Sequence, residues 1–414
     1  MRIGDAANPL HLTYCLNIHP GEHWADVLGA VRGHACEVRN RLGWTGPFGL
    51  GLRLGSVAAH ELMEAGRLAE FKVFLAAEGL YVFTLNGFPY GRFHGTRVKE
   101  KVYAPDWAST ERQDYTAWLT CILAELLPEG VAGSISTVPG AYRTSHGQGA
   151  AAHDNILLGL GRAAAACDEV FRETGRHIRI AIEPEPDCLW DTTDQVIELF
   201  TRDLPGRGAT LLAGDLLIEE PAARQILGAH LGVCLDVCHQ AVLFERPAES
   251  LRRLLAAGVP VAKIQVSAAP TCRTTPAALR QLRAFVDPVY LHQSCLRDAR
   301  GGLRRFADLP EALAAAGDAG PECELRTHFH IPLCVAKAGS LGSTRRLLDR
   351  RFFDLVRGGA SPHIEVETYT FDVLPEGLRR HGVDDNIVAE LRWILAKLGG
   401  TDSQPGAHPA KTDV

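Results

Sequence analysis

A chain of 414 residues with 46% hydrophobic residues can bury a large core, and its net charge of -6 offers no basic field to a nucleic-acid backbone. No stretch of about 18 uncharged apolar residues occurs, which argues against a membrane span. The N-terminus lacks the basic region, apolar segment and cleavage site of a secretory signal. We therefore expect a cytoplasmic protein with small-molecule partners and eleven reduced cysteines.

Eight apolar or alternating runs predict eight β-strands along the chain. They are centred near residues 12, 49, 82, 135, 180, 233, 263 and 365. The chain between successive runs is long enough for at least one helix, and helical spacing is clear at 22–42, 57–77, 109–127 and 155–173. Strands that alternate with helices imply right-handed crossovers and a parallel sheet. Eight such units predict an α/β protein with a closed (β/α)8 TIM barrel.

The domain organisation follows from the spacing of these runs. We expect one barrel domain over residues 1–400, an insertion after the seventh strand at about 270–345, and a disordered tail at 401–414. Within the insertion, 325–333 (LRTHFHIPL) predicts a strand and 341–353 predicts a helix. An open doubly wound sheet is the alternative fold, but NIHPGEHW after the first strand is not a phosphate-binding G-x-G-x-x-G motif.

The run near residue 233 ends in GVCLDVCH, residues 232–239, which predicts a strand that delivers Asp236 and His239 together. An Asp at a strand end often only bonds nearby backbone. However, the run near residue 180 ends at Glu183, and the last run contains Glu367 near its end. Repetition of the same pattern on several strands favours a functional site.

The carboxyl ends of the strands of a TIM barrel meet at one mouth, where the active sites of this fold lie. We therefore expect four side chains to converge there: Glu183, Asp236, Gln265 and Glu367. Three carboxylates in a small volume raise one another's pKa and lose hydration, and a divalent cation relieves both effects. Four polar strand ends that do not meet are the alternative, because strand ends tolerate polar groups.

These motifs resemble the xylose isomerase-like barrels, a superfamily of sugar isomerases, ketose 3-epimerases and endonuclease IV. The resemblance rests on IAIEP with Glu183, LDVCH with Asp236 and His239, and IEVETY with Glu367. More narrowly, four motifs are similar to the EboE family of bacterial metabolite-traffic proteins: LTYCLNIHPGE, YLHQ, HFHIPL and EVETYTFDVLP. Together the motifs span residues 10–375, nearly the whole chain.

The resemblance implies a divalent metal held by Glu183, Asp236 and Glu367. Where the epimerases carry a metal-binding histidine on the seventh strand, this chain has Gln265. Glutamine is the weaker ligand, and an all-oxygen set favours manganese or magnesium over zinc. Alternatively, His330 or His328 from the insertion supplies the missing nitrogen and restores a zinc-like set.

The same resemblance implies metal-assisted proton transfer beside a carbonyl of a sugar-like substrate, with Glu183 and Glu367 as the catalytic acid and base. Residues expected to bind substrate are Asn17, His19, Asn86, His239, His292, Arg326 and His328. Related barrels often dimerise, so a homodimer is the oligomeric state to test.

Three other functions remain open. Gln265 favours a non-catalytic metabolite-binding or traffic protein whose metal set has degraded. An endonuclease IV-like zinc nuclease needs more histidines at the mouth and a basic face, which the net charge of -6 disfavours. A Schiff-base aldolase would use Lys263, although this lysine is expected deeper in the barrel than Gln265.

Overall fold

Eight parallel strands lie at the positions of the eight predicted runs. They are β2 (Leu10–Tyr14), β3 (Phe48–Arg53), β4 (Leu80–Asn86), β5 (Gly133–Thr137), β6 (Ile178–Ile182), β7 (Leu231–Asp236), β8 (Val261–Val266) and β15 (His363–Val366). The computed structural model describes residues 1–4, 9–145, 149–379 and 382–399. The tail expected at 401–414 lies outside the described residues.

The strands pair in the order β2-β15-β8-β7-β6-β5-β4-β3, and a short strand β1 (Arg2–Ile3) adds antiparallel to β2. An isolated parallel bridge between Cys15 and Gly51 joins the ends of β2 and β3 and closes the sheet. The predicted (β/α)8 barrel is therefore confirmed, as is the insertion after its seventh strand β8.

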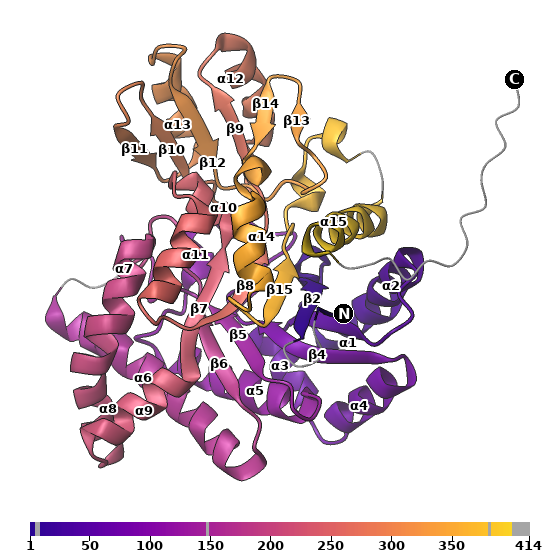
Figure 1. Cartoon of the computed structure of the whole chain (residues 1–414), viewed down its shortest axis with the longest axis vertical. Helices are drawn as coiled ribbons and strands as arrows, with labels where there is room; N and C mark the ends of the chain where they lie inside the picture. Colours follow the sequence, from indigo (N-terminus) through magenta and orange to yellow (C-terminus); the bar gives the residue numbers. More distant parts are fainter. Residues whose placement is uncertain (5–8, 146–148, 380–381, 400–414) are drawn as a thin grey trace, which may run out of the picture.

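Helices surround the barrel, as Figure 1 shows. Their bounds are α1 (Trp24–Ala30), α2 (Cys36–Leu42), α3 (Ser56–Leu62), α4 (Arg67–Ala77), α5 (Thr110–Leu126), α6 (Ala150–Thr174), α7 (Thr193–Glu198), α8 (Ala209–Leu216), α9 (Glu220–His230), α10 (Val237–Val242), α11 (Pro247–Ala256), α14 (Arg350–Arg357) and α15 (Val383–Leu398). Among the described residues no helix is both long and apolar enough to cross a membrane.

The insertion forms a second, antiparallel sheet that stands above the barrel next to α10 (Figure 1). Its order is β11-β10-β12-β9-β14-β13, with bounds β9 (Pro270–Arg273), β10 (Ser294–Arg297), β11 (Leu303–Phe306), β12 (Glu324–Thr327), β13 (Lys337–Ala338) and β14 (Leu341–Ser343). Helices α12 (Pro276–Leu282) and α13 (Leu309–Gly317) accompany it. Because the insertion follows the carboxyl end of β8, it stands over the mouth of the barrel.

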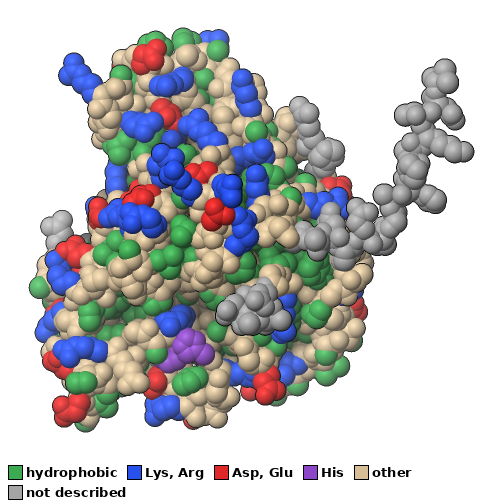
Figure 2. All heavy atoms as spheres, in the orientation of Figure 1, with side chains coloured by type: hydrophobic (Ala, Val, Ile, Leu, Met, Phe, Trp, Pro, Cys, Tyr) green, Lys and Arg blue, Asp and Glu red, His purple; other side chains and the backbone are tan. Residues whose placement is uncertain are grey.

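Figure 2 shows many Lys and Arg side chains on one face of the insertion and at its junction with the barrel. Part of this positive charge is compensated by Glu324 of β12, which contacts Arg326 at 3.0 Å, Arg346 at 2.9 Å and Arg297 at 2.8 Å. These ion pairs join neighbouring segments of the insertion.

Three sequence-based element predictions are wrong in detail. The strand predicted over 232–239 ends at Asp236, because this carboxylate caps α10 by accepting hydrogen bonds from the amides of Cys238 (2.6 Å) and His239 (3.0 Å). The strand predicted over 325–333 ends at Thr327, and His328 and His330 lie in the irregular segment beyond it.

The third error concerns residues 341–353, for which the spacing predicts a helix. The segment begins instead as β14, because Gly342 pairs with Thr271 of β9. The helix α14 starts only at Arg350, after the side chain of Asp349 caps it by accepting from the Phe352 amide. Apolar spacing alone does not reveal a partner strand that lies about seventy residues earlier in the chain.

The interior of the barrel contains a buried ion pair below the mouth. The Nζ of Lys263 lies 2.5 Å from the Oε2 of Glu365, and both side chains are 0% exposed. A side chain at Gly51 would overlap the Oε1 of Glu365, so the close approach of β3 to this carboxylate requires glycine. The barrel therefore holds a charged, tightly packed layer in addition to its apolar core.

A second buried carboxylate, Glu390 on α15, fastens this helix to the barrel and the insertion. Its Oε1 accepts hydrogen bonds from the Leu333 amide and the Thr368 hydroxyl, each at 2.8 Å, and its Oε2 accepts one from Asn386 at 3.0 Å. Burial raises the pKa of Glu390 to about 7 despite these bonds. The folded state thus favours the protonated form.

We expect Glu390→Gln to abolish the part of the decrease in unfolding free energy with rising pH that comes from ionisation of Glu390. Because the folded pKa lies above the unfolded one, the contribution of Glu390 is greatest below the unfolded pKa and declines as the pH rises through about 7. Between pH 5 and pH 8 the free energy of unfolding of the wild type should fall by about 2 kcal/mol relative to the variant. Urea unfolding at several pH values measures this difference, and a pH-independent difference contradicts the prediction.

Candidate metal centre

The mouth of the barrel contains a small cavity. Its volume of about 50 Å³ holds a few water molecules. Its polar lining includes Asn17, Asn86, Glu183, Glu185, His239, His328 and Glu367, and its aromatic lining includes Phe88, Phe93, Tyr103, Tyr290 and Tyr369.

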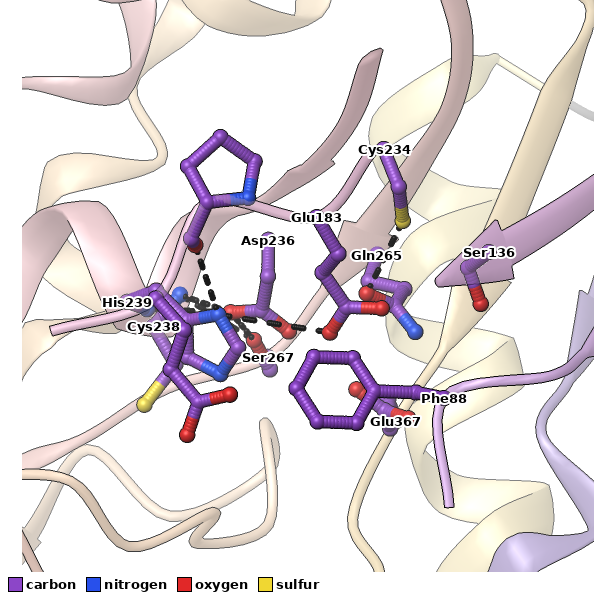
Figure 3. Close-up of polar contacts among 12 residues, drawn as sticks. Phe88, Ser136, Glu183, Cys234, Asp236, Cys238, His239, Gln265, Ser267 and Glu367 are labelled. Carbon is purple, nitrogen blue, oxygen red and sulfur yellow. Dashed lines mark hydrogen bonds and ion pairs between the residues drawn. The ribbon is translucent and has the colours of Figure 1, made fainter. Parts of the chain in front are cut away.

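Three of the predicted residues, Glu183, Asp236 and Glu367, converge at this mouth, as Figure 3 shows. Asp236 is the last residue of β7, and the two glutamates directly follow β6 and β15. All three side chains are buried, with 1–3% exposure. These three side chains lie together because parallel strands place their carboxyl ends at one edge of the barrel.

Hydrogen bonds fix two of these carboxylates. The Oε1 of Glu367 accepts from the amide groups of Asn17 at 2.8 Å and Asn86 at 3.1 Å. The Oδ1 of Asp236 accepts from the hydroxyl of Ser267 at 2.9 Å, in addition to the two amides that it caps. Asp236 Oδ2 and Glu183 Oε2 are buried and have no hydrogen-bond partner among the described residues. Such oxygens are costly to bury unless they bind a ligand.

The pKa values of the three carboxyl groups diverge. Burial, and then the neighbouring carboxylates Glu183 and Asp236, raise the pKa of Glu367 well above its ordinary value. Burial also raises the pKa of Glu183. Burial opposes ionisation of Asp236 as well, but the His239 imidazole and the hydrogen bonds from the His239 amide and the Ser267 hydroxyl outweigh it, so the pKa of Asp236 is lowered. Asp236 is thus the carboxylate that the site keeps ionised.

Three imidazoles meet beside these carboxylates. His239 lies on α10, whereas His328 and His330 lie in the segment that follows β12. The Nε2 of His328 is 3.1 Å from that of His239 and 3.3 Å from that of His330. Burial lowers the pKa of His330 to about 4 and that of His328 well below 6.5, so both rings are neutral at physiological pH.

The other ring nitrogen of each histidine faces an oxygen acceptor. The Nδ1 of His239 lies 3.0 Å from the carbonyl of Pro184, that of His328 lies 2.8 Å from Gln293 Oε1, and that of His330 lies 2.9 Å from the carbonyl of Glu367. Since these oxygens only accept hydrogen bonds, Nδ1 carries the proton in each neutral ring. Burial opposes protonation of His239, but the neighbouring carboxylates Asp236, Glu185 and Glu183 outweigh it and raise the pKa of His239. The neutral rings that present Nε2 lone pairs are therefore those of His328 and His330.

The structure does not present Gln265 as an oxygen ligand. Its Oε1 accepts a hydrogen bond from the thiol of Cys234 at 3.0 Å, and its buried Nε2 has no hydrogen-bond partner among the described residues. The expectation that this oxygen joins the metal set is therefore not supported by its orientation. His330 lies beside the carboxylates, within 4.8 Å of Asp236.

Three residues expected to bind substrate lie outside the cavity lining. His19 bonds the hydroxyl of Tyr14 at 3.1 Å. The Nε of Arg326 donates a hydrogen bond to Glu324 of the same strand at 3.0 Å, and its Nη1 donates one to the carbonyl of Ala241 at 2.7 Å. His292 hydrogen-bonds the carbonyl of His328 at 2.7 Å, so it positions that histidine without facing the cavity.

Other cavity residues were not among the predicted site residues. Glu185 accepts a hydrogen bond from the hydroxyl of Tyr103 at 2.7 Å, and Tyr369 reaches His328 with its hydroxyl at 3.4 Å. The repeated acid in IAIEPEP was the available signal for Glu185, because it stands two residues after Glu183. The aromatic loop GFPYGRFHG contributes Phe88 and Phe93, but loop composition alone does not show which way a ring points.

Lys263 is unsuited to Schiff-base chemistry. Burial alone would lower its pKa, but the adjacent carboxylate of Glu365 raises the pKa above the ordinary value, so the amine stays protonated. Lys263 also does not line the cavity. The aldolase alternative thus lacks both the neutral amine and the access to substrate that it needs.

A scan against models of protein families and a search of curated protein sequences find no match to this chain. Solved structures with a related course of the chain include the probable 3-DHS dehydratase AsbF of Bacillus anthracis, with 13% identity, a TM-score of 0.44, and coverage of 93% of this chain and 98% of that chain. For the IOLI protein with a binding zinc atom the values are 12%, 0.42, 95% and 100%.

A xylose isomerase domain protein from Alicyclobacillus acidocaldarius is similar to the same degree, with 12% identity, a TM-score of 0.43, and coverage of 94% of this chain and 98% of that chain. At TM-scores below 0.5 these likenesses carry no argument about activity. The function must therefore be argued from the residues of this chain.

Proposed function

We propose that the protein is a metal-dependent isomerase or epimerase of the xylose isomerase-like type, acting on a polyhydroxylated small molecule with a carbonyl group. The observation that supports this most is the pair Glu183 and Glu367, two buried carboxyl groups with raised pKa that line one cavity. Carboxyl groups tuned in this way suit proton transfer near neutral pH. The EboE-like motifs further suggest a place in a secondary-metabolite pathway.

The donors at the mouth fit a divalent cation. Asp236 Oδ2 and Glu183 Oε2 are buried oxygens without a partner among the described residues, and the imidazoles of His239 and His330 lie next to them. When bound, zinc, manganese or magnesium would polarise a carbonyl or hydroxyl oxygen of the substrate. Asp236, which the site keeps ionised, and the neighbouring imidazoles are the residues that would hold it.

The reaction itself is assigned to the chain's own carboxyl groups. One carboxylate takes the proton from the carbon next to the carbonyl, and the C–H electron pair forms a C=C bond while the carbonyl oxygen gains a proton. Isomerisation is completed when a proton goes to the former carbonyl carbon and the hydroxyl on the neighbouring carbon loses its proton to a carboxylate. Epimerisation is completed when a proton goes to the opposite face of the original carbon and the carbonyl oxygen returns the proton that it gained. Asn17 and Asn86 hold Glu367 in place for this transfer.

We expect the purified protein to catalyse exchange of a carbon-bound hydrogen for deuterium in D2O, with a ketose or aldose and one added divalent metal. Proton NMR of a panel of sugars measures this exchange. Glu183→Gln and Glu367→Gln should each lower the rate by about 100-fold or more, since each removes one proton-transfer group. His230→Ala, which removes a buried imidazole from α9, serves as the control and should retain the rate. Wild-type rates in both Gln variants would contradict the proposal.

A non-catalytic metabolite-binding or traffic protein is the second candidate, favoured by Gln265 at the position of the epimerases' histidine. In that case sugars bind to the wild type and to both Gln variants alike, without deuterium exchange. Calorimetric titration with the same sugar panel therefore separates binding from catalysis.

A further inference from the structure

We infer that His239, His328 and His330 together bind one ion of the zinc class through their Nε2 atoms, with Asp236 as the adjacent carboxylate. This inference deepens the proposed function by naming the ligands of its cation. It also frees Glu183 and Glu367 from the ligand set, so both remain available to carry protons.

The Nε2 atoms of the three rings converge. The Nε2 of His328 lies 3.1 Å from that of His239 and 3.3 Å from that of His330, while the Nδ1 of each ring faces a carbonyl oxygen. Among the described residues the hydroxyl of Tyr369, 3.4 Å from His328 Nε2, is the donor recorded there. One cation can bind all three Nε2 atoms, which lie within 4.8 Å of one another, when the rings are neutral.

The Nδ1 atom of each ring is held by an oxygen acceptor. Metal-binding histidines usually donate their other N–H to a carbonyl or carboxylate, which fixes the tautomer and the direction of the ring. Two of the three acceptors here are backbone carbonyls. The carbonyl of Pro184 follows Glu183 at the end of β6, and that of Glu367 lies directly after β15. The third is the side chain of Gln293, whose amide nitrogen donates to Tyr103 at 2.5 Å and so leaves its oxygen for His328.

The three imidazoles are buried beside the carboxylate of Asp236. The side chains of His239, His328 and His330 are 0–4% exposed. A carboxylate oxygen of Asp236 lies within 4.8 Å of a ring nitrogen of His330 and, in a second group, of His239. Asp236 Oδ2 has no hydrogen-bond partner among the described residues. Three imidazole nitrogens and one carboxylate oxygen form a set that suits zinc, whereas magnesium prefers oxygen ligands.

The origin of the ligands gives the insertion a role. His239 is delivered by the barrel through α10, but His328 and His330 come from the segment that leaves β12 of the inserted sheet. The second sheet therefore completes the proposed ion site. Its histidines take the place of the ligand that Gln265, turned toward Cys234, does not supply.

The test is metal binding by single-site variants, without any substrate. After dialysis against a weak chelator, the wild type should retain about one zinc ion per chain. We expect His239→Ala, His328→Ala and His330→Ala each to lower zinc affinity by roughly 10-fold to 100-fold or more. Gln265→Ala, Glu367→Gln and the buried-imidazole control His230→Ala should change it by less than about 3-fold. Titration calorimetry and metal analysis give these values.

Cobalt(II) substitution provides a second readout that does not depend on affinity. A cobalt(II) site with three imidazoles and low coordination number gives intense visible absorption. His328→Gln and His330→Gln should weaken this absorption, and Glu367→Gln should leave it unchanged. Circular dichroism identifies variants that fail to fold, and the Gln series replaces the Ala series for those positions. Unchanged zinc affinity and cobalt spectra in all three histidine variants would overturn the inference, as would loss of the ion from Glu367→Gln alone.

The isomerase function and the zinc site can be contradicted independently of each other. Zinc bound by the three imidazoles without deuterium exchange leaves this site standing and removes the isomerase function. Deuterium exchange that survives in the histidine variants but requires Glu183 and Glu367 keeps the isomerase function and removes this site.

Discussion

Lys263→Met is expected to lower the free energy of unfolding by about 3–5 kcal/mol, because it leaves the carboxylate of Glu365 buried without its cation. The two charged groups are 2.5 Å apart and 0% exposed. Glu365 Oε1 has no hydrogen-bond partner among the described residues, and β3 presses against it at Gly51. Water therefore cannot replace the lost amine without displacing a barrel strand. Urea unfolding at constant pH measures the effect.

The matched control is the double variant Lys263→Met with Glu365→Leu. Removing both charges should restore most of the lost stability, since an apolar pair of similar size replaces the ion pair at little net cost. If the double variant is as unstable as Lys263→Met, the loss comes from packing around residue 263, and the electrostatic explanation is wrong. Metal content should be unchanged in both, because neither Lys263 nor Glu365 is a proposed ligand of the ion.

The barrel could be predicted because its strands are buried on both faces and therefore appear as apolar runs separated by helical segments. Local patterns failed where a distant or short-range partner decides the structure. At 341–343 the partner is β9, and at Asp236 the partners are two amide groups that start α10. Neither partner changes the hydrophobic period on which the prediction rested.

The candidate site also contains residues whose positions could be predicted and residues whose orientations could not. Glu183, Asp236 and Glu367 could be placed because each stands at the end of a barrel strand, and the fold brings strand ends together. The directions of Arg326, His292 and the Gln265 oxygen could not be predicted, because each is set by one specific neighbour: Glu324, the His328 carbonyl and the Cys234 thiol. The sequence also does not show that the inserted segment turns its two histidines toward His239.

Asp236→Asn is expected to lower the affinity for a divalent metal by roughly 100-fold or more, since it removes the ionised carboxylate of the site. It should do so with little damage to the fold. The Oδ1 of asparagine can still accept from the amides of Cys238 and His239 and from the hydroxyl of Ser267, so the cap of α10 is preserved. Calorimetric titration with zinc and manganese measures the affinity.

Asp236→Ala separates the two roles of this residue. Alanine removes the cap as well as the charge and leaves buried donors without an acceptor, so the metal-free protein should lose about 1–2 kcal/mol of unfolding free energy relative to Asp236→Asn. Both variants should lose the additional stability that a bound metal gives the wild type. Unfolding with chelator and with added zinc measures both quantities. If Asp236→Asn keeps the wild-type gain from zinc while Asp236→Ala unfolds more readily, Asp236 only caps α10, and the three imidazoles must hold the ion without it.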